Sequence, residues 1–279
     1  MARRPANTGP VARVSRRGAR RARSGQPWLF RSEVIEPAAA PGGSVVRAVD
    51  ETGNPLGMAF WAERSPIALR LLTRRDEACD RDFFRRRLGQ ALALRRQLWP
   101  DGDCCRLVHG EADLLPGLFV DRYADTLSLQ ALSEGAELHT PLLVELLVEL
   151  LRPRLVVAQN DSSGRDFEKL PRRRQILVGD GQPTGVAFRE GDNRFAVDLL
   201  EDLKTGAFLD QRENHLRATA YMPPGGRGLD AFSYHGGFAL ALATRASHVV
   251  AIEQNPLALA RLRAADELAE FRQLHLQFA

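Results

Sequence analysis

Hydrophobic and polar positions follow a strand-like pattern through the first quarter of the chain. Short apolar runs at residues 28–30, 44–49 and 67–72 are separated by turn residues, and the segment Asp-Glu-Thr-Gly-Asn-Pro at 50–55 is a strong turn signal. No helical period of useful length interrupts these runs. The pattern predicts a small all-β unit, a barrel, that begins near residue 11.

The pattern changes to a helical period between residues 80 and 98. Apolar residues recur there every three to four positions. Five arginines lie between them, at Arg85, Arg86, Arg87, Arg95 and Arg96. This predicts an amphipathic helix with a basic face, which either faces water or contacts RNA.

The middle of the chain mixes strands with one helix. A hairpin is predicted from runs at 118–122 and 126–132, followed by a helix at 137–151 and a strand at 155–158. Residues 160–174 are polar and predict a loop or linker, and two further strands are predicted at 185–188 and 194–199. This order indicates an α+β module.

The last stretch alternates strands and helices. Strands are predicted at 228–232, 248–253 and 274–278, and helices at 238–244 and 256–270. This β-α-β-α-β order is typical of the opening of a doubly wound parallel sheet.

A ligand site is expected where the strands of such a sheet end. Asp230 ends the first strand beside a loop with Gly236 and Gly237, which let backbone approach a ligand, and Glu253 ends the second strand. An acid at that point is placed to bind the hydroxyls of a ribose. The alternative is a helix-packing glycine pair with two unrelated acids.

The sequence of the loop between these acids indicates which nucleoside cofactor the site would bind. Residues 230–238 read Asp-Ala-Phe-Ser-Tyr-His-Gly-Gly-Phe, which lacks the G-x-G-x-x-G spacing of a dinucleotide site. An aromatic, acid-containing loop fits S-adenosyl-L-methionine better, because that cofactor is cationic and carries no phosphate. An NAD(P)-linked oxidoreductase is therefore disfavoured.

Four ordered motifs resemble one family from about residue 11 to the end. Residues 230–238 resemble the D-x-F-S-Y-x-G-G-F loop of class I RNA methyltransferases related to the bacterial 23S rRNA cytosine-5 methyltransferases, and residues 204–214 resemble their K-T-G-x-F-x-D-Q-R-x-N segment. Residues 106–123 are similar to their central domain, and Gly-Gln-Pro-Trp-Leu-Phe at 25–30 to their PUA domain, a small RNA-binding barrel. His235, Ala231 and Cys105 depart from the family pattern.

The resemblance implies a fold class and a domain order. An α+β N-terminal part, made of a PUA β-barrel and a central α+β domain, would precede an incomplete α/β Rossmann-like methyltransferase domain. The expected boundaries are a basic tail at 1–10, the PUA domain at 11–79, the central domain with its leading helix at 80–200, and the first part of the methyltransferase domain at 201–279.

The resemblance also implies roles for residues. The cofactor would be S-adenosyl-L-methionine, bound by Lys204, Thr205, Gln211, Arg212, Asp230, Phe232, Ser233, Tyr234, Gly236, Gly237 and Glu253. For Lys204 and Arg212 a structural ion pair is the alternative. The substrate would be 23S rRNA, and a homodimer is left open.

The uneven distribution of charge along the chain supports the expectation that the protein binds RNA. The chain carries +4 overall, but residues 1–25 carry eight arginines and no acid, so the other 254 residues sum to −4. This basic arm predicts contacts to RNA phosphates by Arg16, Arg17, Arg20, Arg21 and Arg23. A solvated tail and a mitochondrial transit peptide are the alternatives.

Composition limits the class of protein. A 44% hydrophobic and 27% charged chain of 279 residues is ordinary for a globular protein, which excludes a disordered, collagen-like or membrane-spanning chain. Three cysteines cannot form a disulfide framework, and they suit a reducing compartment, so the cytoplasm is expected.

Catalysis is not assigned to any residue, and no metal site is predicted. Methylation at cytosine C5 needs a thiolate nucleophile, but Cys79, Cys104 and Cys105 lie far in sequence from the cofactor loop. A complete methyltransferase sheet needs roughly three times the chain that follows residue 225. We therefore expect a truncated chain with weak or absent turnover. A non-catalytic PUA-type RNA-binding protein is the main alternative.

Overall fold

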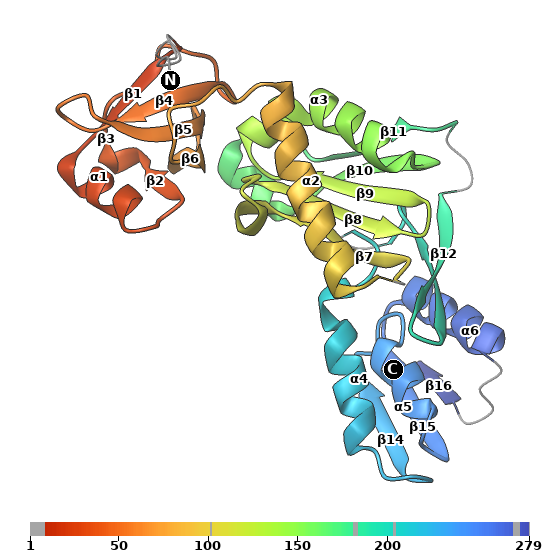
Figure 1. The fold of residues 1–279 in the computed structure, drawn as a ribbon. Helices are drawn as coiled ribbons and strands as arrows, with labels where there is room; N and C mark the ends of the chain where they lie inside the picture. The colour runs from red at the N-terminus through yellow and green to blue at the C-terminus, as the bar shows by residue number, and fades with distance from the viewer. Residues whose placement is uncertain (1–8, 101, 181–183, 203–204, 270–273, 279) are drawn as a thin grey trace.

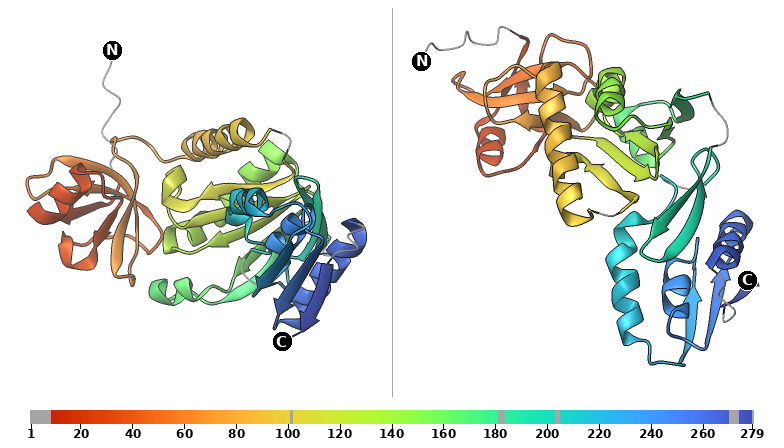
Figure 2. Two further views of the ribbon diagram at one scale, coloured as in Figure 1. Left: turned by 90° about the horizontal axis from the view of Figure 1, so that it is seen from below. Right: turned by 45° about the vertical axis from the view of Figure 1, so that its right-hand side comes forward.

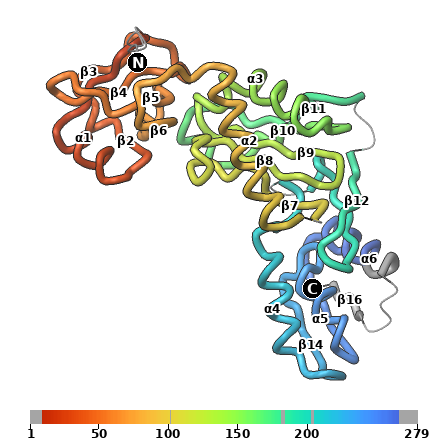
Figure 3. Tube along the Cα trace, in the orientation of Figure 1, coloured from red at the N-terminus to blue at the C-terminus, as the bar shows by residue number. Residues whose placement is uncertain are grey.

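In the part of the chain that the structure describes, four sheets, one of them a two-stranded hairpin, are arranged along an elongated molecule (Figure 1). The computed structural model describes residues 9–100, 102–180, 184–202, 205–269 and 274–278. The first described strand lies in the six-stranded sheet, and the last lies in the three-stranded sheet at the opposite end of the molecule (Figure 3).

The N-terminal sheet has the strand order β2-β6-β5-β4-β1-β3, in which only β1 and β4 pair in parallel. Its strands are β1 (Val11–Val14), β2 (Trp28–Phe30), β3 (Val34–Glu36), β4 (Val45–Val49), β5 (Pro55–Trp61) and β6 (Ile67–Thr73). The runs predicted at 28–30, 44–49 and 67–72 are β2, β4 and β6. Apart from the short 3₁₀ turn η1 (Arg31–Glu33), the all-β expectation for this part is correct except at one element.

That exception is helix α1 (Arg16–Arg23), which contains the predicted RNA-binding arginines. The sequence pattern indicated no helix here, and this prediction was wrong. The buried face of α1 consists of Gly18, Ala19 and Ala22. These side chains are small and only weakly hydrophobic, so the sequence shows no clear helical period of apolar residues here. Ser15 caps the helix by accepting a hydrogen bond from the Gly18 amide at 3.3 Å.

The central part is a five-stranded sheet with two long helices. Its order is β11-β10-β9-β8-β7, and only β9 and β10 pair in parallel. The elements are α2 (Arg81–Leu98), β7 (Cys104–His109), β8 (Leu118–Tyr123), β9 (Thr126–Ala131), α3 (Glu134–Leu151), β10 (Leu155–Asn160) and β11 (Arg173–Val178). The basic helix is confirmed as α2, which begins after the cap residue Asp80, whose side chain accepts from the Phe83 amide at 3.0 Å.

The predicted loop at 160–174 is only partly a loop. It contains the 3₁₀ turn η3 (Ser163–Glu168), and its last two residues begin β11. β11 is an edge strand with no fully buried residue, and its first two residues are arginines, so its sequence lacks the alternation that identifies a half-buried strand.

The C-terminal sheet has the predicted β-α-β-α-β order and is parallel throughout. Its elements are β14 (Arg227–Ala231), α5 (Gly237–Ala243), β15 (His248–Glu253), α6 (Pro256–Ala269) and β16 (Leu274–Phe278). Helix α4 (Arg212–Tyr221), which was not predicted, precedes it and packs on α5.

A separate hairpin of β12 (Gly185–Glu190) and β13 (Asn193–Asp198) lies between the central sheet and the C-terminal sheet (Figure 2). Phe188 and Phe195 on this hairpin share one hydrophobic core with Tyr123 of β8, Leu240 of α5 and Leu262 of α6. The hairpin therefore connects the two parts and supplies a wall of the site described next.

Candidate functional site

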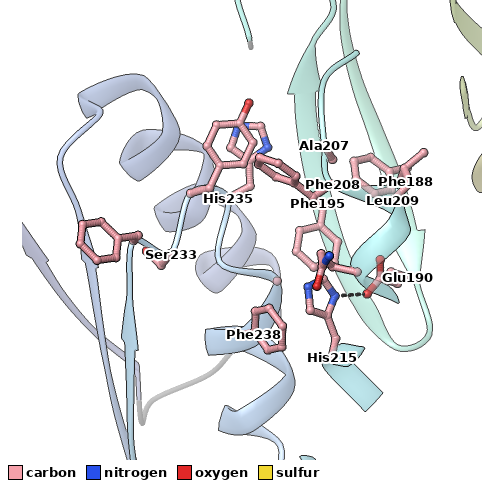
Figure 4. Close-up of a pocket in the computed structure, with 14 residues that line it drawn as sticks. Phe188, Glu190, Phe195, Ala207, Phe208, Leu209, His215, Ser233, His235 and Phe238 are labelled. Atoms are coloured by element: carbon pink, nitrogen blue, oxygen red, sulfur yellow. Dashed lines mark hydrogen bonds and ion pairs between the residues drawn. The ribbon is translucent and has the colours of Figure 1, made fainter. Parts of the chain in front are cut away.

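A cavity of about 290 Å³ lies where β14 ends, between the loop that follows β14, the β12–β13 hairpin and the segment that leads into α4 (Figure 4). Aromatic rings dominate its wall: Phe188, Phe195, Phe208, His215, Phe232, Tyr234, His235 and Phe238. The cavity therefore lies at the strand end where the sequence predicts a ligand site, and its wall is more aromatic than the sequence suggested.

The loop after β14 has an unusual backbone. Phe232 (φ 63°) and Tyr234 (φ 51°) adopt the left-handed conformation, which costs about 1–3 kcal/mol at each such residue. Hydrogen bonds hold the loop in place: the Ser233 amide donates to the Ile252 carbonyl at 3.0 Å, and the Tyr234 hydroxyl donates to the Gly206 carbonyl at 3.0 Å. Strain held by the surrounding structure is characteristic of ligand sites.

The two loop glycines are explained by packing. At Gly236, which has φ 79°, a Cβ atom would overlap the side chain of Leu262, and at Gly237 it would overlap the ring of His215. Neighbouring side chains therefore fill the space that a Cβ would take at either glycine, which accounts for the absence of side chains there. Gly237 also lines the cavity, and the expected approach of the glycine backbone to a ligand stays a prediction.

The two predicted acids lie beneath the loop and support it. Asp230 accepts a hydrogen bond from the Ala239 amide in α5 at 2.9 Å, and burial raises the pKa of its carboxyl. Glu253 accepts from the amides of Tyr234 at 2.7 Å and Asn255 at 2.6 Å. Each carboxylate oxygen can accept a second hydrogen bond, so Glu253 retains acceptor capacity for a ligand hydroxyl.

Two buried polar side chains in the cavity wall lack hydrogen-bond partners among the described residues. They are Ser233, 7% exposed, and His235, 5% exposed, whose two ring nitrogens are both unpaired. The His235 ring stacks on Tyr234 with centroids 3.9 Å apart, and its Nε2 lies 3.7 Å from Asp202. Because buried polar groups are normally hydrogen-bonded, these atoms are suited to bind the polar groups of a ligand.

Burial, reinforced by the positive charge of Arg261, lowers the pKa of His235 to about 3. A histidine in the unfolded chain titrates near 6.5, so acidification between these values adds a proton to the unfolded chain only. The contribution of neutral His235 to the free energy of unfolding is therefore fully present above about pH 6.5, and it is lost as the pH falls toward 3.

Replacing His235 by asparagine tests this pH dependence. From pH 7 to pH 5 we expect the wild-type free energy of unfolding to fall by about 2 kcal/mol more than that of His235→Asn, measured by urea denaturation. Equal pH slopes in the two proteins would contradict this.

A histidine and an acid that the sequence did not single out complete the wall. His215 Nδ1 lies 2.6 Å from Glu190 Oε1, and its ring meets Phe238 edge-on at 4.6 Å (Figure 4). Glu190 belongs to β12 and His215 to α4, so the pair forms only on folding. The one available signal was the alternation of Val186 and Phe188 along β12, which directs that face inward.

The predicted cofactor residues divide between the cavity wall and its surroundings. Asp230, Gly236 and Glu253 lie outside the wall, whereas Gln211, Phe232, Ser233, Tyr234 and Gly237 line the cavity. Arg212 does not; it donates to the Cys104 carbonyl at 3.2 Å and lies over the Trp99 ring. The Thr205 hydroxyl donates to Asp121 in the central sheet, and Lys204 lies outside the described residues.

No cysteine lines the cavity. Burial raises the pKa of Cys79 and of Cys104 to about 12, and it also raises the pKa of Cys105. The three thiols are therefore protonated at neutral pH, and a protonated thiol is a poor nucleophile.

The arginines of α1 divide into two groups. Arg21 pairs with Glu33 at 3.3 Å, and Arg23 with Asp50 at 2.5 Å. Arg16, Arg17 and Arg20 are exposed. These arginines, which the sequence describes as a basic arm, lie on helix α1, and their contact with RNA stays a prediction.

The described residues offer neither a clustered metal site nor a membrane-spanning helix. No group of three or more histidine, cysteine, aspartate or glutamate side chains there could hold a metal ion. None of the helices in that part of the chain combines the length and apolar character needed to span a bilayer.

The chain is similar to one known domain family and, over most of its length, to several known proteins. Residues 12–74 match the PUA-like domain family. Over 250 residues the chain is 37% identical to the ribosomal RNA large subunit methyltransferase I of Aliivibrio fischeri, a match that covers 88% of this chain and 63% of that protein. The enzyme of the same name from Erwinia tasmaniensis is 36% identical over 252 residues, covering 87% of this chain and 62% of that protein. The chain thus spans less than two thirds of the length of these relatives.

Solved structures share the fold. A candidate SAM-dependent methyltransferase from Streptococcus mutans superposes with a TM-score of 0.80 at 17% identity, covering 96% of this chain and 70% of the other. A structure of a candidate methyltransferase complexed with SAH gives a TM-score of 0.81 at 16% identity with the same coverage. The predicted order of a PUA-like sheet before an α/β methyltransferase fold is thereby confirmed.

Proposed function

We propose that this chain binds S-adenosyl-L-methionine in the aromatic cavity and serves methylation of large-subunit ribosomal RNA. The observation that carries the proposal is the strained loop at the end of β14, which lines a cavity in a chain 37% identical to a ribosomal RNA methyltransferase. A protein-bound SAH in a structure of the same fold supports the cofactor.

The cavity chemistry fits this cofactor. Aromatic faces attract cations, and the reactive centre of S-adenosyl-L-methionine is a sulfonium. When bound, the cofactor supplies an electrophilic methyl group. On the protein side, Ser233 and His235 in the cavity wall would bind the polar methionine end. Glu253 lies outside that wall and accepts from the Tyr234 amide at 2.7 Å, and we propose that its remaining acceptor capacity binds the ribose hydroxyls. His235 stays neutral at physiological pH because its pKa is low, so it can donate from one ring nitrogen and accept at the other.

The RNA part of the proposal rests on the N-terminal module and the relatives. A PUA-like sheet carries the exposed arginines of α1, and the relatives are named as ribosomal RNA methyltransferases. We propose cytosine C5 as the target atom and assign no catalytic residue, because the three cysteines are protonated and lie outside the cavity. A cytoplasmic location and a homodimer stay predictions.

Calorimetric titration tests the proposal. We expect heat of binding with S-adenosyl-L-methionine and with S-adenosylhomocysteine, and none with NAD. Heat with NAD alone would contradict the methyltransferase assignment. Salt-sensitive RNA binding with no response to either adenosyl ligand would instead favour a non-catalytic RNA-binding protein.

A further inference from the structure

A second cavity, of about 560 Å³, adjoins the proposed cofactor cavity. The two share Ala207, Phe208 and Tyr234, so the Phe208–Tyr234 ring pair, with centroids 5.1 Å apart at 83°, forms the partition between them. The remaining wall comes from the central sheet and from the segment between β10 and β11. We call this second cavity the sheet groove.

The charges in the sheet groove are already neutralised. Arg106 makes two hydrogen bonds to Asp121, at 2.8 and 2.9 Å, and Arg174 contacts Asp161 at 2.7 Å. Asp210 adds another carboxylate to the wall. A phosphate would meet paired arginines and nearby acids, so the groove favours a neutral ligand over an anion.

The walls offer flat surfaces on two sides. The Arg106 guanidinium lies over the Phe119 ring, 5.5 Å from its centroid, and the Phe208–Tyr234 pair forms the partition. Stacking on such surfaces is the common way in which proteins hold unpaired bases.

Polar groups are available to bind the edge of a ring. The Gln130 amide nitrogen donates to the Gln159 carbonyl at 3.0 Å, and its carbonyl oxygen makes no hydrogen bond within the described residues. Ser162 accepts from the Gly164 amide at 3.3 Å, which leaves its hydroxyl hydrogen to donate. One acceptor and one donor at a flat groove match the hydrogen-bonding edge of a nucleobase.

We propose that the sheet groove receives one unstacked base of the RNA substrate and presents it across the Phe208–Tyr234 partition. This rests on the proposed function, because it makes the groove the substrate side of the same site. It specifies single-stranded or flipped-out nucleotides as the substrate class, since a base held in a duplex cannot enter the groove.

The test uses the full chain and a short single-stranded oligoribonucleotide that contains one 2-aminopurine. We expect its fluorescence to change on binding, and Phe119→Leu to weaken that binding about tenfold, because Phe119 supports the Arg106 guanidinium on which the base would stack. Gln130→Ala is a second, independent variant with the same expected direction. Phe167→Leu is the matched control, since Phe167 is 69% exposed and does not line the groove.

Three further readouts separate the outcomes. Both groove variants should keep wild-type thermal unfolding and bind S-adenosylhomocysteine within about twofold of wild type, because neither residue lines the cofactor cavity. The same RNA in a duplex should bind the variants and the wild type equally. Unchanged single-strand binding in both variants, or an equal loss for single strand and duplex, would overturn the groove proposal. Failure of the wild type to bind S-adenosylhomocysteine would instead overturn the proposed function.

Discussion

Replacing Gly236 by alanine is expected to abolish the binding of S-adenosylhomocysteine. Gly236 has φ 79°, and a methyl group on it would overlap Leu262, which is fully buried in the core beneath the loop. The loop must therefore move away from Leu262, and Ser233 and Tyr234 would leave the cavity wall with it. A shift of this kind at a ligand loop costs affinity steeply, and we expect a loss of at least about 100-fold.

Gly225 provides the matched control. It has nearly the same backbone angle, φ 71°, but nothing lies within 4 Å of the position that its Cβ would take. Gly225→Ala should therefore cost about 1–2 kcal/mol of stability from the left-handed conformation alone and leave ligand affinity nearly unchanged.

A compensating substitution tests whether the contact with Leu262 causes the loss of affinity. Leu262→Ala removes the side chain that a methyl group at residue 236 would overlap, so the double variant should recover affinity relative to Gly236→Ala. Calorimetry with S-adenosylhomocysteine and thermal unfolding of all four variants measure this. Equal affinity losses for the alanine variants at 225 and 236 would show that backbone strain is responsible and that the contact with Leu262 is not.

The elements of the C-terminal sheet were predictable from the sequence because their pattern is strong. β15 and β16 coincide with the runs predicted at 248–253 and 274–278, and both acids lie at strand ends as expected. β15 contains a continuous apolar run, Val-Val-Ala-Ile at 249–252, which needs no tertiary information to recognise. Helix α1 was missed for the opposite reason, because its buried face consists of a glycine and two alanines.

The orientation of individual cofactor residues was not predictable. Thr205, Gln211 and Arg212 lie in or beside an irregular segment with one 3₁₀ turn, η4 (Leu209–Gln211), and such a segment has no period that assigns its side chains to a face. Of the three, only Gln211 lines the cavity. Similarly, the pairing of Glu190 with His215 depends on how the hairpin packs against α4, which no local pattern encodes.

Replacing Glu253 by alanine is expected to weaken the binding of S-adenosylhomocysteine by about 100-fold, because charge-assisted hydrogen bonds each contribute about 1.5–3 kcal/mol. Two effects combine in this loss. The variant removes the proposed acceptor for the ribose hydroxyls, and it leaves the amides of Tyr234 and Asn255 without the acceptor that positions the loop.

A ligand analogue separates these two effects. The 2′-deoxyribose form of S-adenosylhomocysteine lacks one hydroxyl that Glu253 would bind, so it should bind wild type at least about tenfold more weakly than the parent ligand. In Glu253→Ala the two ligands should bind equally, because the acceptor is gone. If the variant kept the wild-type preference for the ribose form, Glu253 would act only by positioning the loop. Glu213→Ala is the control: Glu213 is exposed, its ion pair with Arg217 spans 3.8 Å, and affinity should stay within about twofold of wild type.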